Sequence, residues 1–221
     1  EEIILEWSNE NRLNSFNSYK GLLYAEHYKK IVSWMEGKNP LPAPIEASLD
    51  PVNACNNFCY YCNSQRYLRE HPAGLQQWDS KFIRETLNRL VDVVCKAFCW
   101  GGGGESLLNK SIRGVTRYCV ERGMECSIIT NGVLLDDELI DELLLCRWIG
   151  ISLDSADPEA YRIVRGTDDC LRVLNNVSRL VKKRTKCDIS IKVLVLPETI
   201  NTIVYTCKIA KELGVQSIHI R

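Results

Sequence analysis

The sequence lacks an excess of charge of either sign, and it lacks any long apolar run. Lys plus Arg and Asp plus Glu each total 28, which gives a formal net charge of zero. A chain without a net field has no general attraction for nucleic acid or for an anionic membrane surface, so we expect no nucleic-acid partner. No stretch of about 18 apolar residues occurs, and we therefore expect no membrane span.

Cysteine, in contrast, is abundant. The chain carries 11 cysteines among 221 residues, an odd number, and no apolar signal segment precedes them. Secreted disulfide scaffolds are short and rich in loops, whereas this chain is long and regularly patterned. We therefore predict reduced or metal-bound thiols and a reducing, cytoplasmic location. Eight cysteines fall mostly in apolar helix or strand patterns and are expected to pack as small hydrophobes: Cys95, Cys99, Cys119, Cys126, Cys146, Cys170, Cys187 and Cys207.

Short apolar runs alternate with amphipathic stretches along most of the chain. Strands are predicted at residues 45–50, 97–102, 126–132, 148–154, 189–196 and 217–221, and helices near 79–95, 106–122, 136–145, 158–183 and 200–213. This alternation favours an α/β fold with a parallel sheet covered by helices, either an open doubly wound sheet or a whole or partial barrel. In each of these folds, chemistry lies at the carboxyl ends of the strands.

The first 44 residues differ from the rest of the chain. Residues 20–36 have helical spacing, and three prolines follow in "GKNPLPAPIE". We therefore predict a helical appendage and linker at 1–44 and one α/β domain at 45–221. The chain starts at Glu1 without an initiator Met and stops at Arg221 inside a predicted strand, so we expect further sequence beyond both ends.

Three cysteines lie close together directly after the first predicted strand, in "DPVNACNNFCYYCNSQ". Thiolates are the usual ligands of iron–sulfur clusters, and three of them hold three irons of a [4Fe–4S] cluster while the fourth iron takes an external ligand. Phe58 and Tyr61 are expected to shield such a cluster. Two other interpretations remain: a zinc site with His71 or Asn63 as its fourth ligand, and an incidental trio.

The spacing Cys-x-x-x-Cys-x-aromatic-Cys, with Tyr61 as the aromatic residue, resembles the signature of the radical S-adenosylmethionine (SAM) superfamily. The resemblance implies that Cys55, Cys59 and Cys62 hold a [4Fe–4S] cluster whose open iron binds SAM.

A run of glycines, "CWGGGGES", follows the second predicted strand. A phosphate-binding loop is not expected, because no Gly-Lys-Ser/Thr follows and Ser106 stands where GxGxxG requires its third glycine. Gly103, Gly104 and Glu105 instead resemble the superfamily's Gly-Gly-Glu motif, which receives the amino group of SAM. Ser106 stands where proline is common in that motif, and a flexible turn is the alternative interpretation.

The third and fourth predicted strands end in "IITNG" and "ISLDS". Thr130 and Asn131 resemble the family's Thr-Asn-Gly at the pocket rim. Ser152 and Asp154 share one face of their strand by its period of two, and the family pattern implies that they contact the ribose hydroxyls of SAM. The alternative for Asp154 is an ordinary cap of the helix that starts near Pro158.

Basic and apolar residues further along complete the resemblance. Arg165, in "YRIVRG", stands where the family's Arg-Gly falls and could hold the SAM carboxylate, with Arg162 as its neighbour. A solvated helix charge is the alternative. Val195 and His219, on the last two predicted strands, are candidates for flanking the adenine.

The resemblance covers about residues 45–221 and implies a partial (β/α)6 TIM-like barrel with a short N-terminal helical appendage. It implies an enzyme that cleaves SAM to a 5′-deoxyadenosyl radical, which abstracts hydrogen from a peptide, protein or small-metabolite substrate. A flavodoxin- or ferredoxin-like electron donor is implied as well. The motif order is most similar to the branch that often carries C-terminal SPASM or twitch domains with auxiliary clusters. The rival functions are a non-catalytic iron–sulfur electron-transfer or sensing protein and a zinc-stabilised binding module.

Overall fold

The structure is a computed structural model that describes residues 25–70 and 74–221. The chain divides into two compact units, Glu1–Ile45 and Glu46–Arg221. In the first unit, helix α3 spans Ala25–Met35, within the predicted helix at 20–36, whose residues 20–24 lie outside the described part. Glycine at position 37 has a φ of +71°, which suits the chain reversal that follows the helix.

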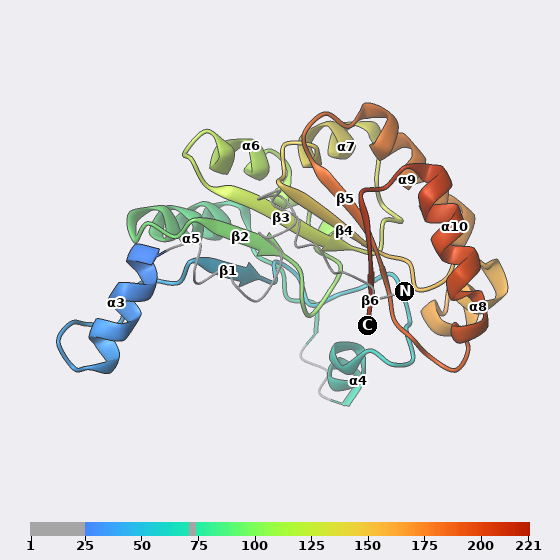
Figure 1. Cartoon of the computed structure of the whole chain (residues 1–221), viewed down its shortest axis with the longest axis horizontal. Coiled ribbons are helices and arrows are strands. Elements are labelled where there is room, and N and C mark those ends of the chain that lie inside the picture. The colour runs from blue at the N-terminus through green and yellow to red at the C-terminus, as the bar shows by residue number, and fades with distance from the viewer. Residues whose placement is uncertain (1–24, 71–73) are drawn as a thin grey trace, which may run out of the picture. The chain divides into compact units, whose positions relative to one another are not determined.

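The second unit is built on one sheet of six parallel strands in the order β1-β2-β3-β4-β5-β6 (Figure 1). The strands are β1 Glu46–Leu49, β2 Ala97–Trp100, β3 Glu125–Thr130, β4 Trp148–Ser152, β5 Asp188–Val193 and β6 Ser217–Ile220. Each strand pairs in parallel with its sequence neighbour, so every connection crosses over in the same direction along the sheet. Because such crossovers are right-handed as a rule, the connecting helices fall on one face. The α/β prediction is confirmed, and the unclosed sheet is a partial barrel rather than a doubly wound sheet.

The helices of this unit other than α4 pack apolar side chains against one side of the sheet. The helices are α4 Asn63–Glu70, α5 Ser80–Asp92, α6 Val115–Val120, α7 Asp137–Leu143, α8 Pro158–Arg165, α9 Cys170–Lys183 and α10 Ile203–Leu213, with 3-10 turns η1 Ser106–Leu108, η2 Lys110–Ile112 and η3 Ile200–Thr202, and their bounds differ in part from prediction. The predicted helix at 106–122 is therefore two short turns followed by α6. Helix α4, directly after the cysteine loop, was not predicted.

The predicted helix at 158–183 is interrupted at Gly166, which ends α8 with a left-handed φ of 69°. A Cβ atom there would lie 2.8 Å from the Cβ and 2.9 Å from the carbonyl oxygen of Phe58. The break therefore lets the end of α8 approach the cysteine loop more closely than any other residue type would allow.

The two faces of the sheet have different surroundings. Ile149 and Ile151 of β4 are fully buried in the apolar core that the helices cover. Ser152 and Lys192 have the opposite parity on their strands, and both line the concave side. The helices thus stabilise the outer face by apolar burial and leave the inner face for polar side chains. Within the described residues, no helix combines the length and apolar character needed to cross a membrane.

Candidate active site

A cavity of about 250 Å³ opens at the carboxyl ends of the strands. It is lined by all three cysteines of the predicted cluster and by seven of the predicted SAM contacts, Gly104, Glu105, Thr130, Asn131, Ser152, Asp154 and Arg165. Gly103 instead lines a separate hollow beside α4, together with Asn63. Residues spread over more than 100 positions of sequence, from Cys55 to Arg165 and beyond, therefore meet in one place.

The cysteine loop carries three free thiols, with Cys59 buried and Cys55 and Cys62 half-buried. Its backbone turns at the end, where the N–H of Cys62 donates to the carbonyl of Cys59 at 3.1 Å. Phe58, predicted to shield a cluster, has a side chain that is 65% exposed. Tyr61 does line the cavity, as expected.

Backbone contacts from two other segments hold this loop. The N–H of Glu105 donates to the carbonyl of Ala54 at 2.8 Å, and the N–H of Phe58 donates to the carbonyl of Arg165 at 2.9 Å. At Gly104, a Cβ atom would lie 2.4 Å from the carbonyl oxygen of Val52 and 2.5 Å from that of Ala54. Glycine at position 104 is thus required for the close packing of the glycine run against the cysteine loop, in addition to any ligand contact.

Asn131 fixes the loop from the end of β3. Its Nδ2 donates to Oδ1 of Asn56 at 2.7 Å and to Oδ1 of Asn57 at 3.2 Å, and its own Oδ1 accepts from the N–H of Val133 at 3.0 Å. The side chain predicted at the pocket rim therefore directs its Nδ2 group to the loop that carries the thiols and its Oδ1 to its own turn.

Glu105 is almost fully buried and joins β2 to β3. Oε1 accepts from the hydroxyl of Thr130 at 2.7 Å and from the N–H of Leu107 at 3.2 Å, and Oε2 accepts from the N–H of Asn131 at 2.7 Å. Burial raises the pKa of this carboxyl, and the bonds from Asn131, Thr130 and Leu107 oppose the rise. A carboxylate offers about four lone-pair sites, so room for roughly one further donor remains.

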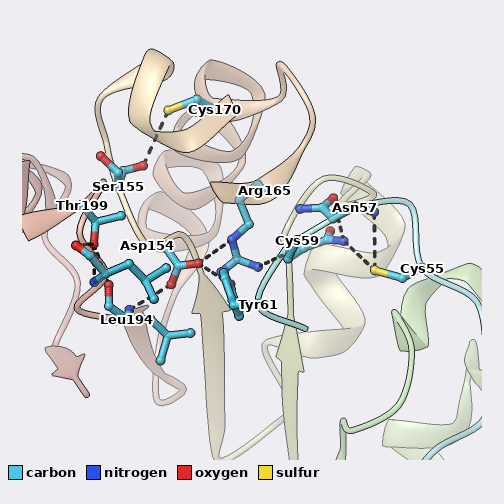
Figure 2. A network of polar contacts seen from close by, with 12 residues as sticks. Cys55, Asn57, Cys59, Tyr61, Asp154, Ser155, Arg165, Cys170, Leu194 and Thr199 are labelled. Atoms are coloured by element: carbon cyan, nitrogen blue, oxygen red, sulfur yellow. Dashed lines mark hydrogen bonds and ion pairs between the residues drawn. The ribbon is translucent and has the colours of Figure 1, made fainter. Parts of the chain in front are cut away.

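Asp154 lies in the loop after β4 with a left-handed φ of 63° and is the centre of a buried polar network (Figure 2). Its Oδ2 lies 2.8 Å from Nε of Arg165 and accepts from the hydroxyl of Tyr61, while its Oδ1 accepts from the N–H of Leu194 at 3.0 Å. The cap of α8 is Asp157, whose Oδ1 accepts from the N–H of Ala160 at 2.9 Å. The capping alternative for Asp154 is therefore wrong.

The guanidinium of Arg165 reaches from Asp154 toward the cysteine loop. Its Nη1 donates to Sγ of Cys59 at 3.7 Å, and its Cζ lies 6.0 Å from the centre of the Tyr61 ring. The Nε–H has no acceptor in line with it, so the contact with Asp154 is an ion pair by distance rather than an aligned hydrogen bond. Burial, the largest single effect, would lower the pKa of Arg165, but the charge of Asp154 together with those of Tyr61, Cys59 and Tyr161 outweighs it and raises the pKa. A solvated helix charge is excluded for this residue.

Several residues that line the cavity belong to no motif by which the sequence could have predicted them. Lys192 and Arg221 line the cavity from β5 and from the residue after β6, beside the predicted candidate His219. The sequence predicts Tyr61 only as an aromatic residue that shields the cluster. In the structure its hydroxyl also donates to the carboxylate of Asp154, 93 positions away. Val195 is 45% exposed and does not line the cavity. His71, weighed as a zinc ligand, lies outside the described residues.

The residues present fit a thiolate-bound cluster with a polar ligand beside it. Three thiols share one cavity, the backbone N–H of Asn57 donates to Sγ of Cys55 at 3.4 Å, and the buried Nδ2 of Asn57, which also lines the cavity, has no hydrogen-bond partner. Among residues 25–70 and 74–221, no three Cys, His, Asp or Glu side chains are arranged to hold one metal ion. A cluster needs no such common point, because each thiolate binds a different iron.

Comparisons with known proteins point in the same direction. Residues 49–210 match the family described as the Radical SAM superfamily. AlbA, an antilisterial bacteriocin subtilosin biosynthesis protein of Bacillus subtilis, is 26% identical over 136 residues, 59% of this chain and 29% of AlbA. An AdoMet-dependent heme synthase of Methanosarcina barkeri is 26% identical over 183 residues, 80% of this chain and 50% of the synthase.

Among solved structures, SuiB of Streptococcus suis bound to its precursor peptide SuiA superposes with a TM-score of 0.70 at 18% identity, over 100% of this chain and 46% of SuiB. That likeness shows the fold, a partial barrel. The chain spans half or less of the length of AlbA, the heme synthase and SuiB.

Proposed function

This chain belongs to the radical SAM superfamily, and on that basis we propose that residues 45–221 form the catalytic domain of an enzyme that cleaves SAM reductively at a [4Fe–4S] cluster. Residues 1–44 are proposed as a helical appendage. When bound, these cofactors supply a 5′-deoxyadenosyl radical, which removes a hydrogen atom from the substrate. The observation that carries the proposal is the meeting of Cys55, Cys59 and Cys62 with Glu105 in one cavity.

The chain's own residues have distinct roles in this proposal. The three thiolates hold three irons and leave the fourth for SAM. Gly104 and the remaining lone pair of Glu105 receive the amino group of SAM. Ser152 faces the ribose, and Asp154 acts on SAM through Arg165, whose guanidinium it positions. The walls of the barrel exclude water from the reacting atoms.

The proposal extends to the class of substrate, the electron donor and the location of the enzyme. We propose hydrogen abstraction from a peptide, a protein or a small metabolite, and we favour a peptide because SuiB is bound to the precursor peptide SuiA and AlbA is named as a bacteriocin biosynthesis protein. The same two likenesses support the branch that often carries SPASM or twitch domains. We further propose a flavodoxin- or ferredoxin-like electron donor and a reducing, cytoplasmic location.

The test compares wild-type protein with the Cys55→Ala/Cys59→Ala/Cys62→Ala variant after anaerobic reconstitution. We expect iron and sulfide in the wild type, none in the variant, and 5′-deoxyadenosine from SAM when the wild type is reduced with dithionite. The half-buried Cys207→Ala on α10 is the matched control and should behave as wild type. Unchanged iron in the triple variant would refute the ligand set.

The same measurement separates the rival functions. Iron and sulfide without SAM cleavage would identify a non-catalytic electron-transfer or sensing protein. Zinc without sulfide would identify a zinc-stabilised module.

A further inference from the structure

One wall of the cavity is basic. Lys192 of β5, His219 of β6 and Arg221 after β6 all line it, on neighbouring strands. The cysteine loop and Glu105 follow β1 and β2, whereas the basic residues come from β5 and β6, at the other end of the strand order.

The cavity's own carboxylates do not neutralise this wall. Glu105 and Asp154 are the only acidic residues in its lining. Glu105 is occupied by Thr130, Leu107 and Asn131, and Asp154 by Arg165, Tyr61 and Leu194. Within the described residues, no ion pair joins Lys192, His219 or Arg221 to an acidic side chain.

Burial and mutual repulsion act on the same groups. Burial lowers the pKa of Lys192, and the nearby charge of Arg221 lowers it further. Burial also lowers the pKa of His219, followed by the charges of Arg221 and Lys192. A bound anion would offset the repulsion between Lys192 and Arg221 and part of the desolvation cost of Lys192, and it would favour the protonated form of His219.

The wall is also preorganised. The His219 ring stacks on the ring of Trp148, with centroids 5.6 Å apart, and its Nε2 lies 3.4 Å from the hydroxyl of Ser217. Ser217 contacts Ser190 at 2.6 Å, and Ser190 accepts from Nε1 of Trp148 at 2.7 Å. This chain of contacts holds the imidazole on the cavity side before any ligand arrives, which lowers the cost of binding.

We propose that Lys192, His219 and Arg221 form an anion site that binds a carboxylate or phosphate group of the substrate. The inference rests on the proposed function and deepens it by naming the substrate class. The bound anion could come from two molecules, because the substrate and SAM itself can each supply a carboxylate. We assign the site to the substrate because Arg165, near the cysteine loop, is the cation placed beside the proposed SAM position.

The test uses the reconstituted protein saturated with SAM and not reduced, so that no turnover occurs. Glyoxylate, a small aldehyde that carries a carboxylate, forms an imine with a lysine amine and releases water. Cyanoborohydride then reduces the imine to a carboxymethyl group that mass spectrometry locates. Acetaldehyde is the uncharged comparison, and the exposed Lys208 on α10 is the matched control residue.

We expect the Lys192-to-Lys208 rate ratio to be at least about tenfold larger with glyoxylate than with acetaldehyde, because the lowered pKa of Lys192 favours both aldehydes alike and only glyoxylate carries a carboxylate. Equal ratios for the two aldehydes would overturn the site. Inorganic phosphate should slow the glyoxylate reaction at Lys192 alone. The variant Arg221→Gln should reduce the preference while SAM binding stays intact. Equal reaction of glyoxylate at Lys192 and Lys208 would overturn the site.

A second outcome concerns the source of the anion. Complete protection of Lys192 by SAM, with labelling only in its absence, would assign the anion site to SAM and overturn the substrate assignment. Formation of 5′-deoxyadenosine by the reduced wild type tests the proposed function separately.

Discussion

Arg165 and Asp154 form an ion pair of 2.8 Å that the chain covers almost completely, with side chains only 7% and 2% exposed. Arg165 ends α8, and Asp154 lies in the loop after β4. Tyr61, which belongs to the cysteine loop, donates a hydrogen bond to Asp154 and so connects this loop to the ion pair. The pair thus connects the loop that carries the thiols to α8 and to the loop after β4. It lines the cavity and does not belong to the apolar core.

The first prediction concerns this pair. Arg165→Gln leaves the Asp154 charge buried without a cation, so the free energy of unfolding should fall by about 3–5 kcal/mol. Urea unfolding of the metal-free protein measures it. Arg162→Gln on the same helix is the control, because the contact of Arg162 with Asp168 is 3.7 Å long and its side chains are 56% and 86% exposed. That variant should lose at most about 1 kcal/mol. Equal, small losses in both variants would contradict the structural role of the pair.

The second prediction concerns two adjacent glycines. Gly104→Ala would drive a Cβ atom into the carbonyls of Val52 and Ala54, which are backbone atoms and cannot rotate away. The cysteine loop should shift, so iron content after reconstitution should drop and stability should fall by roughly 1–3 kcal/mol. At Gly103 the nearest atom to such a Cβ is Oδ2 of Asp50 at 3.6 Å, an ordinary contact.

Gly103→Ala is therefore the matched control, and we expect it to keep the iron content of the wild type. If Gly103→Ala were the more damaging of the two, the glycine run would act on a ligand rather than on the cysteine loop. SAM affinity of both variants, measured by equilibrium dialysis, distinguishes these cases.

The third prediction separates two neighbouring aspartates. Asp157→Ala removes the cap of α8 and should cost about 0.5–2 kcal/mol of stability, with SAM affinity unchanged. Asp154→Asn keeps the size but removes the charge that positions Arg165, so SAM affinity should fall in protein that is still folded. Thermal unfolding and SAM binding on both variants provide the measurement. An effect of Asp157→Ala on SAM affinity equal to that of Asp154→Asn would refute the division of roles.

The sequence was sufficient to predict the sheet because each strand carries its own local signal. The runs around Ile149 and Ile151 are apolar for their whole length, and turn residues bound them. The same local reasoning failed at 158–183, where the helical pattern continues through the break. Gly166 ends α8 as a left-handed cap, which the sequence marks by one glycine alone, and the close approach of Phe58 to its backbone is contained in no local pattern.

The candidate site shows the same limit. The cysteines and Glu105 could be predicted because the family motif fixes their spacing. The contact of Tyr61 with Asp154 joins positions 93 apart, and the inward direction of Lys192 depends on the parity of β5 within the sheet. The sequence shows Lys192 only as one charge in an apolar strand, so its place in the cavity required the fold.

The last prediction concerns Glu105, whose carboxylate accepts three hydrogen bonds inside the protein. Glu105→Gln keeps the size and removes the charge, so the loss of one charge-assisted bond to the SAM amino group should weaken SAM binding by about 1.5–3 kcal/mol, roughly ten- to hundredfold. The three thiolates are untouched, and the cluster should remain. Thr130→Val is the comparison, because it removes one donor to Oε1 and leaves the carboxylate in place.

Calorimetric SAM binding and iron content on both variants separate two roles. If Glu105 binds SAM, Gln should weaken binding far more than Thr130→Val does, at unchanged iron content. If Glu105 only joins β2 to β3, both variants should lower the melting temperature by similar amounts and leave SAM affinity alone, because both then weaken the same buried network. Wild-type SAM affinity in a folded Glu105→Gln variant with its cluster intact would therefore remove Glu105 from the SAM site.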